Sequence, residues 1–356
     1  MSSPLTQQVL ADPVALTRAL VDIESVSRNE KEIADTVQEV LAPLPHLTVE
    51  RMGHTLIART NLGRGQRVVL AGHLDTVPIA GNFPSTVDAQ RIWGCGTADM
   101  KAGTALALHF AATAPEPKFD VTYFFYECEE IEHEFNGLNK VAAARPELLQ
   151  ADFAVLLEPT FGIVEAGCQG TMRARIRLTG RRAHSARSWL GVNAIHAAGE
   201  VLDRLAAYRA REVEIDGCQF HEGLNAVKIK GGVAGNVVPD LCEIEVNFRF
   251  APDRSVEQAT AHLQEIFDGY EMEIADSAPA AMPGLSAAAA KGFVEAVGSE
   301  PKAKLGWTDV SRFAALGIPA LNYGPGDPNL AHTREEHVEI EKIETGAQVL
   351  RRWLVG

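Results

Sequence analysis

The spacing of apolar residues divides the first half of the chain into helical and extended segments. From about Pro13 to Leu44 the apolar residues recur at helical spacing, which predicts helix with one buried face. Short continuous apolar runs occupy 67–72, 121–126 and 153–157, and an alanine- and leucine-rich helical segment lies at 101–113. Strands that alternate with helices predict an α/β fold, with a mostly parallel sheet covered by helices on both faces.

The middle of the chain alternates polar and apolar residues with a period of two. Residues 171–179 and 243–250 both do so, which is typical of antiparallel strands with one solvated face. Helical spacing returns at 193–211 and 256–267. We therefore predict an α/β domain of residues 1–173 and 282–356, with residues 174–281 inserted as a small α+β domain.

Composition narrows the classes of partner. A chain of 356 residues suggests about two domains. The net charge of -14 argues against nucleic acid or an anionic membrane surface as a partner. No apolar run approaches the ~20 residues that span a bilayer, and the N-terminal 25 residues lack the pattern of a signal peptide. Five widely spaced cysteines without a CxxC pair favour a reducing, cytoplasmic setting.

Candidate metal ligands follow the three apolar runs. His73 and Asp75 come after the first, Glu129 and Glu130 after the second, and Glu158 after the third. Open α/β sheets place their ligand sites at the carboxyl ends of strands, so these side chains are expected at one edge. His73 and Asp75 share a face if the segment is extended, and a carboxylate there could orient a metal-bound imidazole.

Two further candidates lie in glycine-bearing loops. Asp99 ends the stretch Gly94-Cys-Gly-Thr-Ala-Asp99, where a dinucleotide fingerprint would have a third glycine, so the dehydrogenase interpretation fails. A carboxylate in such a turn can reach between two cations, although it could also simply cap a helix. His332 follows a loop rich in glycine and proline. Taken singly, these residues also fit plain structural roles. Together they indicate a two-metal hydrolytic site.

The order of these motifs resembles a known family. The chain contains HLDTVP at 73–78, GTADMKAG at 96–103, paired glutamates, EPT at 158–160 and a late loop histidine. This pattern resembles the co-catalytic zinc family of carboxypeptidase G, aminoacylase, acetylornithine deacetylase and succinyl-diaminopimelate desuccinylase, and the resemblance covers essentially the whole chain. Further stretches, among them RRAHSARSWLGVNAIH and GGVAGNVVPD, resemble the desuccinylase branch as found in actinobacteria.

The resemblance implies a metal site with assigned roles. It makes Asp99 a bridge between two zinc ions per subunit, for which cobalt or manganese could substitute. His73 and Glu158 would complete the coordination of one ion, and Glu130 and His332 would complete the coordination of the other. Glu129 would be the general base.

It also implies a homodimer and a substrate pocket. His184 would reach across the dimer into the partner's site and polarise the scissile carbonyl. Asn236 and Arg249 match positions that hold a substrate carboxylate, and Thr308 matches a further polar contact. The family also has a cis peptide after the bridging aspartate, here Asp99-Met100.

The implied activity is hydrolysis of N-succinyl-LL-diaminopimelate to succinate and LL-diaminopimelate, a step towards lysine and cell-wall precursors. Two alternatives remain at this point. The same site could act on another small N-acyl amino acid, such as N-acetylornithine, or on a dipeptide. A metal-dependent binding protein without catalysis is a different class, and Glu129 argues against it because binding alone needs no spare carboxylate.

Overall fold

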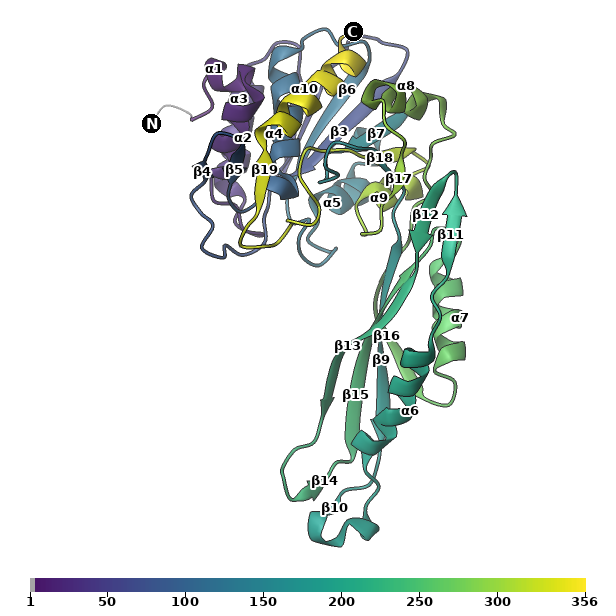
Figure 1. Ribbon diagram of the computed structural model, residues 1–356. Coiled ribbons are helices and arrows are strands. Elements are labelled where there is room, and N and C mark those ends of the chain that lie inside the picture. The colour runs from purple at the N-terminus through teal and green to yellow at the C-terminus, as the bar shows by residue number, and fades with distance from the viewer. Residues whose placement is uncertain (1–3) are drawn as a thin grey trace. The chain divides into compact units, whose positions relative to one another are not determined.

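The computed structural model describes residues 4–356; residues 1–3, the start of the segment considered above for a signal peptide, lie outside it. The chain forms two compact units (Figure 1). Unit 1 runs up to Ala166 and resumes over Pro283–Lys302 and Thr308–Gly356. Unit 2 comprises Gly167–Met282 and Ala303–Trp307.

Unit 1 is built on an eight-stranded sheet. In spatial order its strands are β1 (Thr48–Met52), β2 (Thr55–Arg59), β6 (Asp120–Tyr126), β3 (Arg67–His73), β7 (Phe153–Leu156), β18 (Ala320–Asn322), β8 (Glu165–Ala166) and β17 (Lys302–Ala303). The central strands β6, β3, β7 and β18 are parallel. Antiparallel pairing is found towards the edges, between β1 and β2, β2 and β6, and β18 and β8.

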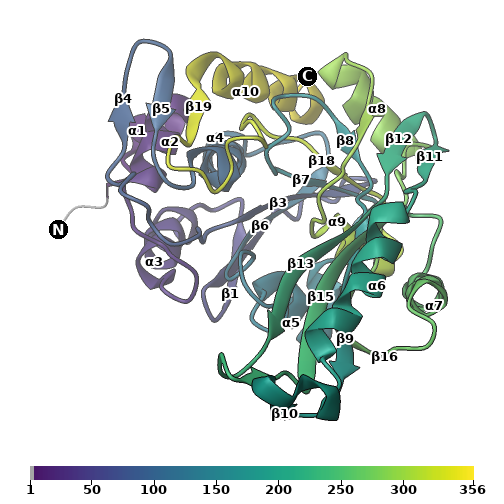
Figure 2. The ribbon, with the colours of Figure 1, turned by 60° about the horizontal axis from the view of Figure 1, so that its bottom comes forward.

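Helices flank this sheet, with α4 and α10 on one side and α5 on the other (Figure 2). The helices of unit 1 are α1 (Gln7–Ala11), α2 (Pro13–Val21), α3 (Lys31–Leu41), α4 (Ala102–Thr113), α5 (Gly137–Ala144), α8 (Ala288–Val297), α9 (Val310–Ala315) and α10 (Ile340–Leu354), with the short turns η1 (Thr97–Lys101) and η2 (Pro146–Leu148). Helix α4 is buried along nearly its whole length. The helical spacing over 13–44 corresponds to two helices, because α2 ends at Val21 and α3 begins at Lys31.

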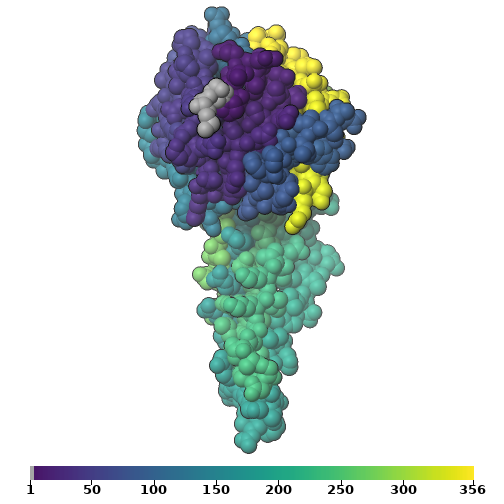
Figure 3. All heavy atoms as spheres, turned by 90° about the vertical axis from the view of Figure 1, so that its left-hand side faces the viewer, coloured from purple at the N-terminus to yellow at the C-terminus, as the bar shows by residue number. Residues whose placement is uncertain are grey.

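A small antiparallel sheet joins the C-terminal part of unit 1 to the segment that precedes η1. Its strands are β19 (His337–Glu339), β5 (Arg91–Trp93) and β4 (Thr86–Val87). Val338 pairs with Ile92, and both side chains are buried. Figure 3 shows this part of the chain (blue) next to the N-terminal helices (purple) and the C-terminal segment (yellow).

Unit 2 has its own core beneath an antiparallel sheet. The sheet runs β13 (Gly223–Gly231), β15 (Leu241–Phe250), β9 (Gly170–Thr179) and β16 (Glu271–Ala278). Helices α6 (Ala194–Ala207) and α7 (Val256–Ile266) pack on one face through residues such as Val201, Phe248 and Leu263. Ion pairs cover the other face, including Arg173–Asp276 at 3.0 Å. The shorter elements are β10 (Ala183–His184), η3 (Ser185–Leu190), β11 (Glu212–Ile215), β12 (Cys218–His221) and β14 (Val237–Val238).

The predicted α/β fold, with a mostly parallel central sheet and a second, antiparallel α+β part, is confirmed. In the described part of the chain, no helix combines the length and apolar character needed to cross a membrane.

Candidate metal centre

The ends of three adjacent parallel strands carry most of the candidate ligands. β3 ends at His73 and lies between β6 and β7. Glu129 and Glu130 follow β6, and Glu158 follows β7. Because parallel strands end at the same edge of a sheet, these side chains meet there.

Asp99 occupies the centre of this cluster, with one carboxylate oxygen towards each histidine. Its Oδ1 lies 3.2 Å from His73 Nε2, and its Oδ2 lies 3.4 Å from His332 Nε2. His332 Nε2 is also 3.0 Å from Glu130 Oε1. A carboxylate that bridges two cations must present its two oxygens in this way. The peptide bond between Asp99 and Met100 is cis, as the resemblance implied.

The candidate ligand atoms fall into overlapping groups whose members all lie within 4.8 Å of one another. One group is His73, Asp99 and Glu158; another is Asp99, Glu130 and His332; a third is His73, Glu129 and Glu130. The first two groups share Asp99. The structure therefore places all five sequence-derived ligands, and Glu129 with them, in one cluster.

The pKa values of the clustered side chains are shifted in the directions expected for a site with excess negative charge. Burial and the neighbouring carboxylate of Glu158 raise the pKa of Glu129 well above its usual range. Hydrogen bonds to Asp99 and Glu130 raise the pKa of His332 to about 10. Burial alone would lower the pKa of His73, but the carboxylates of Asp75 and Asp99 raise it well above its usual value. Carboxylates this close are costly to ionise together unless cations neutralise them.

The donor set fits divalent transition metals. Two imidazoles and three carboxylates suit zinc and are also compatible with cobalt or manganese. The two groups that share Asp99 supply enough donors for two ions, with Glu129 left over.

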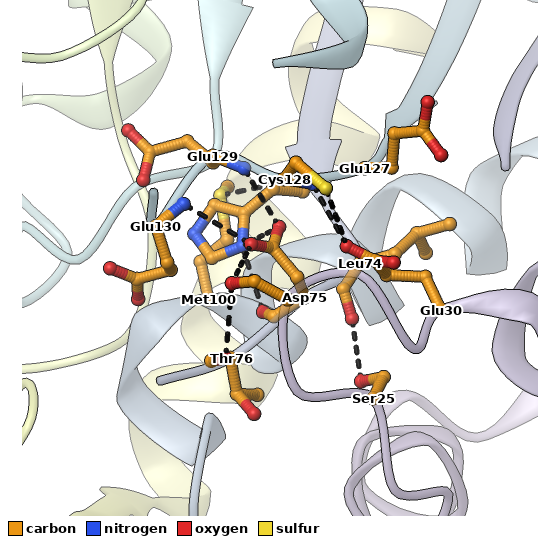
Figure 4. Close-up of polar contacts among 12 residues, drawn as sticks. Ser25, Glu30, Leu74, Asp75, Thr76, Met100, Glu127, Cys128, Glu129 and Glu130 are labelled. Carbon is orange, nitrogen blue, oxygen red and sulfur yellow. Dashed lines mark hydrogen bonds and ion pairs between the residues drawn. The ribbon is translucent and has the colours of Figure 1, made fainter. Parts of the chain in front are cut away.

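Asp75 holds the loop that carries the paired glutamates (Figure 4). Its carboxylate accepts the backbone N–H groups of Glu129 at 3.0 Å and Glu130 at 3.1 Å, and the hydroxyl of Ser27 at 2.7 Å. His73 Nδ1 lies 3.0 Å from the backbone oxygen of Asp75 and 3.5 Å from its carboxylate. Asp75 therefore orients the Glu129–Glu130 loop as well as the imidazole.

Glu30 is a buried residue that sequence reasoning missed. Its carboxylate accepts the backbone N–H of Cys128 at 3.0 Å and lies 3.2 Å from the thiol of Cys128. Burial raises the pKa of that thiol to about 12, so the thiol is the donor. Cys128 has a φ of 56°. The sequence pattern did not single out Glu30, because this residue lies in a stretch whose apolar residues recur continuously at helical spacing.

Glu336 was also missed. It is buried, and its carboxylate accepts the backbone N–H groups of Gly96, Ala98 and Asp99 at 2.9, 2.9 and 3.1 Å. Burial raises the pKa of this carboxyl group to about 7. Nothing in the local sequence distinguishes Glu336 from its exposed neighbour Glu335.

Two glycines allow the C-terminal loop to reach the centre. A Cβ atom on Gly324 would lie 2.4 Å from the backbone oxygen of Leu157, and one on Gly326 would lie 2.3 Å from that of Ala98. No larger residue fits so close to another backbone. This contact brings the loop that carries His332 over both ligand-bearing segments.

The remaining candidates do not form a single group. His184 and Asn236 are exposed neighbours in unit 2, where His184 pairs with Val237 and the N–H of Ser185 donates to the backbone oxygen of Asn236. Arg249 lies near the far end of β15, eight residues or about 26 Å of extended strand beyond Leu241 at ~3.3 Å each.

Thr308 belongs to unit 1, where it is buried and donates to Asn322 Oδ1 at 2.9 Å.

A family model matches most of the chain. Residues 69–355 match the model described as peptidase family M20/M25/M40. This range includes every proposed ligand.

Individual proteins match over nearly the whole chain. A Mycobacterium tuberculosis protein that carries the provisional name succinyl-diaminopimelate desuccinylase is 57% identical, covering 97% of this chain and 98% of that protein. The succinyl-diaminopimelate desuccinylase of Corynebacterium glutamicum is 50% identical, covering 97% of each. The solved structure of a Staphylococcus aureus tripeptidase superposes with a TM-score of 0.80 at 23% identity, over 97% of both chains.

We expect metal binding to release protons. With a pKa of about 10, His332 is protonated at pH 7 in the metal-free protein and has to lose its proton to act as a ligand. Affinity for zinc should therefore rise with pH, by about tenfold per pH unit for each proton released. Calorimetric titration at pH 7 in buffers of different ionisation enthalpy measures the release.

His332→Ala should reduce the proton release, whereas His133→Ala, at an exposed position, should not. Identical heats in all buffers would contradict the expectation.

Proposed function

Because the chain belongs to peptidase family M20/M25/M40, we propose that it is a succinyl-diaminopimelate desuccinylase, which hydrolyses N-succinyl-LL-diaminopimelate to succinate and LL-diaminopimelate. The observation that carries this proposal is the cluster around Asp99, found in a chain that matches desuccinylases along nearly its whole length. We further propose a cytoplasmic location, which fits five free, buried cysteines.

Two zinc ions are proposed as the cofactor. His73, Asp99 and Glu158 would hold one ion, and Asp99, Glu130 and His332 the other. Bound there, zinc would lower the pKa of the attacking water and polarise the scissile carbonyl.

Glu129 is proposed as the proton carrier. It lies within the cluster without being needed as a ligand to either ion, and Asp75 fixes its backbone. Its carboxylate would take the proton of the attacking water and return it to the leaving amine. Burial and the neighbouring carboxylate of Glu158 raise its pKa, which favours its holding a transferred proton.

His184 is proposed to stabilise the oxyanion. Its Nδ1 accepts the backbone N–H of Ala186 at 3.0 Å, so the neutral ring carries its proton on Nε2. Among the described residues, none is hydrogen-bonded to that nitrogen. An Nε2–H group of an exposed histidine can donate to a developing oxyanion.

Arg249 is proposed to bind a substrate carboxylate. Its guanidinium is partly buried, burial lowers its pKa, and no carboxylate of the described residues forms an ion pair with it. A partly desolvated guanidinium without a partner is suited to a bidentate anion. Asn236 and Thr308 are proposed as further polar contacts of the substrate.

A homodimer would bring these groups together. His184 and Arg249 lie near opposite ends of β15, so a small substrate cannot touch both within one copy of unit 2. A second copy can supply the missing residue. We propose that each site uses Arg249 of its own chain and His184 of the partner subunit.

The surface for this partner is the free edge of β13 with the adjoining helix α6. Exposed apolar side chains gather there: Val227 and Ile229 on β13, and Ile195 and Leu202 on α6. A long edge strand with unpaired backbone groups favours continuation of the sheet, and self-complementary pairing about a twofold axis is the commonest form.

The first experiment compares substrates. Zinc-loaded protein should hydrolyse N-succinyl-LL-diaminopimelate and leave N-acetylornithine nearly unchanged, and chelation should abolish turnover. Arg249→Lys should raise KM by about tenfold because the bidentate fork is lost. Arg173→Lys, an exposed ion-paired residue of β9, is the control. Turnover of the acetyl compound instead would refute the assigned substrate.

Glu129→Gln should keep both metals and lower kcat by about 10²–10⁴-fold, because the amide cannot carry the proton. Metal content by mass spectrometry and steady-state kinetics check this, with exposed Glu134→Gln as control. An undiminished kcat in this variant would refute the proposed role of Glu129 as the general base.

The shared site can be tested by mixing two inactive variants. His184→Ala and Glu129→Gln each damage every site in their own homodimer. A mixed dimer contains one site with intact Glu129 and an intact histidine from the partner, so re-equilibrated equal mixtures should recover about a quarter of the activity. If both residues served the same chain's site, the mixture would stay inactive.

A further inference from the structure

The segment that carries Asp99 is held from the side by a single residue. The N–H groups of Gly96, Ala98 and Asp99 all donate to the carboxylate of Glu336, the last two to the same oxygen. The N–H of Gly94 donates to the backbone oxygen of Glu336 at 3.0 Å. Four backbone donors between residues 94 and 99 thus converge on one residue.

Glu336 is itself firmly placed. Its side chain is 2% exposed, and the next residues form β19, which pairs with β5. Val338 is buried in that pairing, and the ring of His337 lies 4.2 Å from that of Trp93. The carboxylate is therefore anchored by strand pairing on one side while it binds the Asp99 segment on the other.

Among the described residues, no other side chain accepts these three N–H groups. Neither η1 nor α4, which follow Gly96, has a side-chain hydrogen bond at its start. The bond from Asp99 N–H to Glu336 Oε1 fixes the backbone from which the carboxylate of Asp99 extends. Asp99 belongs to both proposed metal groups, so a shift of its backbone would disturb both.

We propose that Glu336 is a positioning residue for the bridging carboxylate: it orients Asp99 for two metal ions by binding the backbone of residues 96–99. This inference rests on the proposed two-metal function. Glu336 touches neither ion nor substrate in this scheme, and it acts through Asp99.

The replacement that best isolates this role is Glu336→Gln, which preserves size. A carboxamide has only one oxygen, so its NH₂ group must face at least one of the three N–H donors. Glu335→Gln is the matched control, because Glu335 is the exposed neighbour in the same segment.

Three readouts test the proposal. Hydrogen exchange of the metal-free protein should be at least tenfold faster in E336Q within residues 94–101 and unchanged in α10. Zinc affinity, from competition with a chelator, should fall by about 10–100-fold, as for other residues that orient metal ligands. At limiting zinc kcat should fall while KM changes by less than twofold, and excess zinc should restore most of kcat. E335Q should match wild type throughout.

Wild-type zinc affinity and exchange in E336Q would overturn the proposal. Faster exchange spread over all of unit 1, with normal affinity in the folded fraction, would also overturn it and leave Glu336 a purely structural role. If the wild-type protein binds no zinc, the proposed function fails instead. The exchange measurement still decides in that case whether Glu336 orders the Asp99 segment.

Discussion

Repulsion among carboxylates is the constraint around which unit 1 is organised. Asp99, Glu129, Glu130 and Glu158 meet at one edge of the sheet, and the ligand groups found among the described residues contain two histidines to offset them. Three further buried acids, Glu30, Asp75 and Glu336, are not among the proposed ligands. Each accepts a backbone N–H group from a loop that carries proposed ligands, and an intramolecular hydrogen bond contributes about 0.5–1.5 kcal/mol. The loops are thereby held in place before any cation binds.

In the proposed scheme, unit 2 contributes residues that no single copy can bring to one substrate. Most of the length of β15 separates Arg249 from the exposed pair His184 and Asn236. Val227 and Ile229 on the edge strand β13 are exposed, and we propose this edge as the surface for a second copy. Substrate recognition and assembly are therefore linked in the proposed scheme, because a site gains its oxyanion donor only when two chains associate.

The sequence predicted the parts of the centre that depend on local pattern. His73, Glu129, Glu130 and Glu158 each follow an apolar run, and parallel strands bring such positions to one edge. Glu30 was hidden within helical spacing that the structure interrupts after Val21. Glu336 is buried next to the pairing of β19 with β5, a contact between segments more than 240 residues apart. Contacts between such distant segments produce no periodic pattern of apolar residues, so they could not be predicted from the sequence.

The order of the ligands along the chain bears on how the protein matures during synthesis. His73, Asp99 and Glu158 all precede unit 2, whereas His332 follows it. A ribosome-bound chain thus possesses every ligand of one group before unit 2 has been translated. The other group stays incomplete until Gly324 and Gly326 have docked against the earlier segments. One proposed ion site therefore draws only on residues that precede unit 2, whereas the other depends on contacts between segments on either side of unit 2 in the sequence.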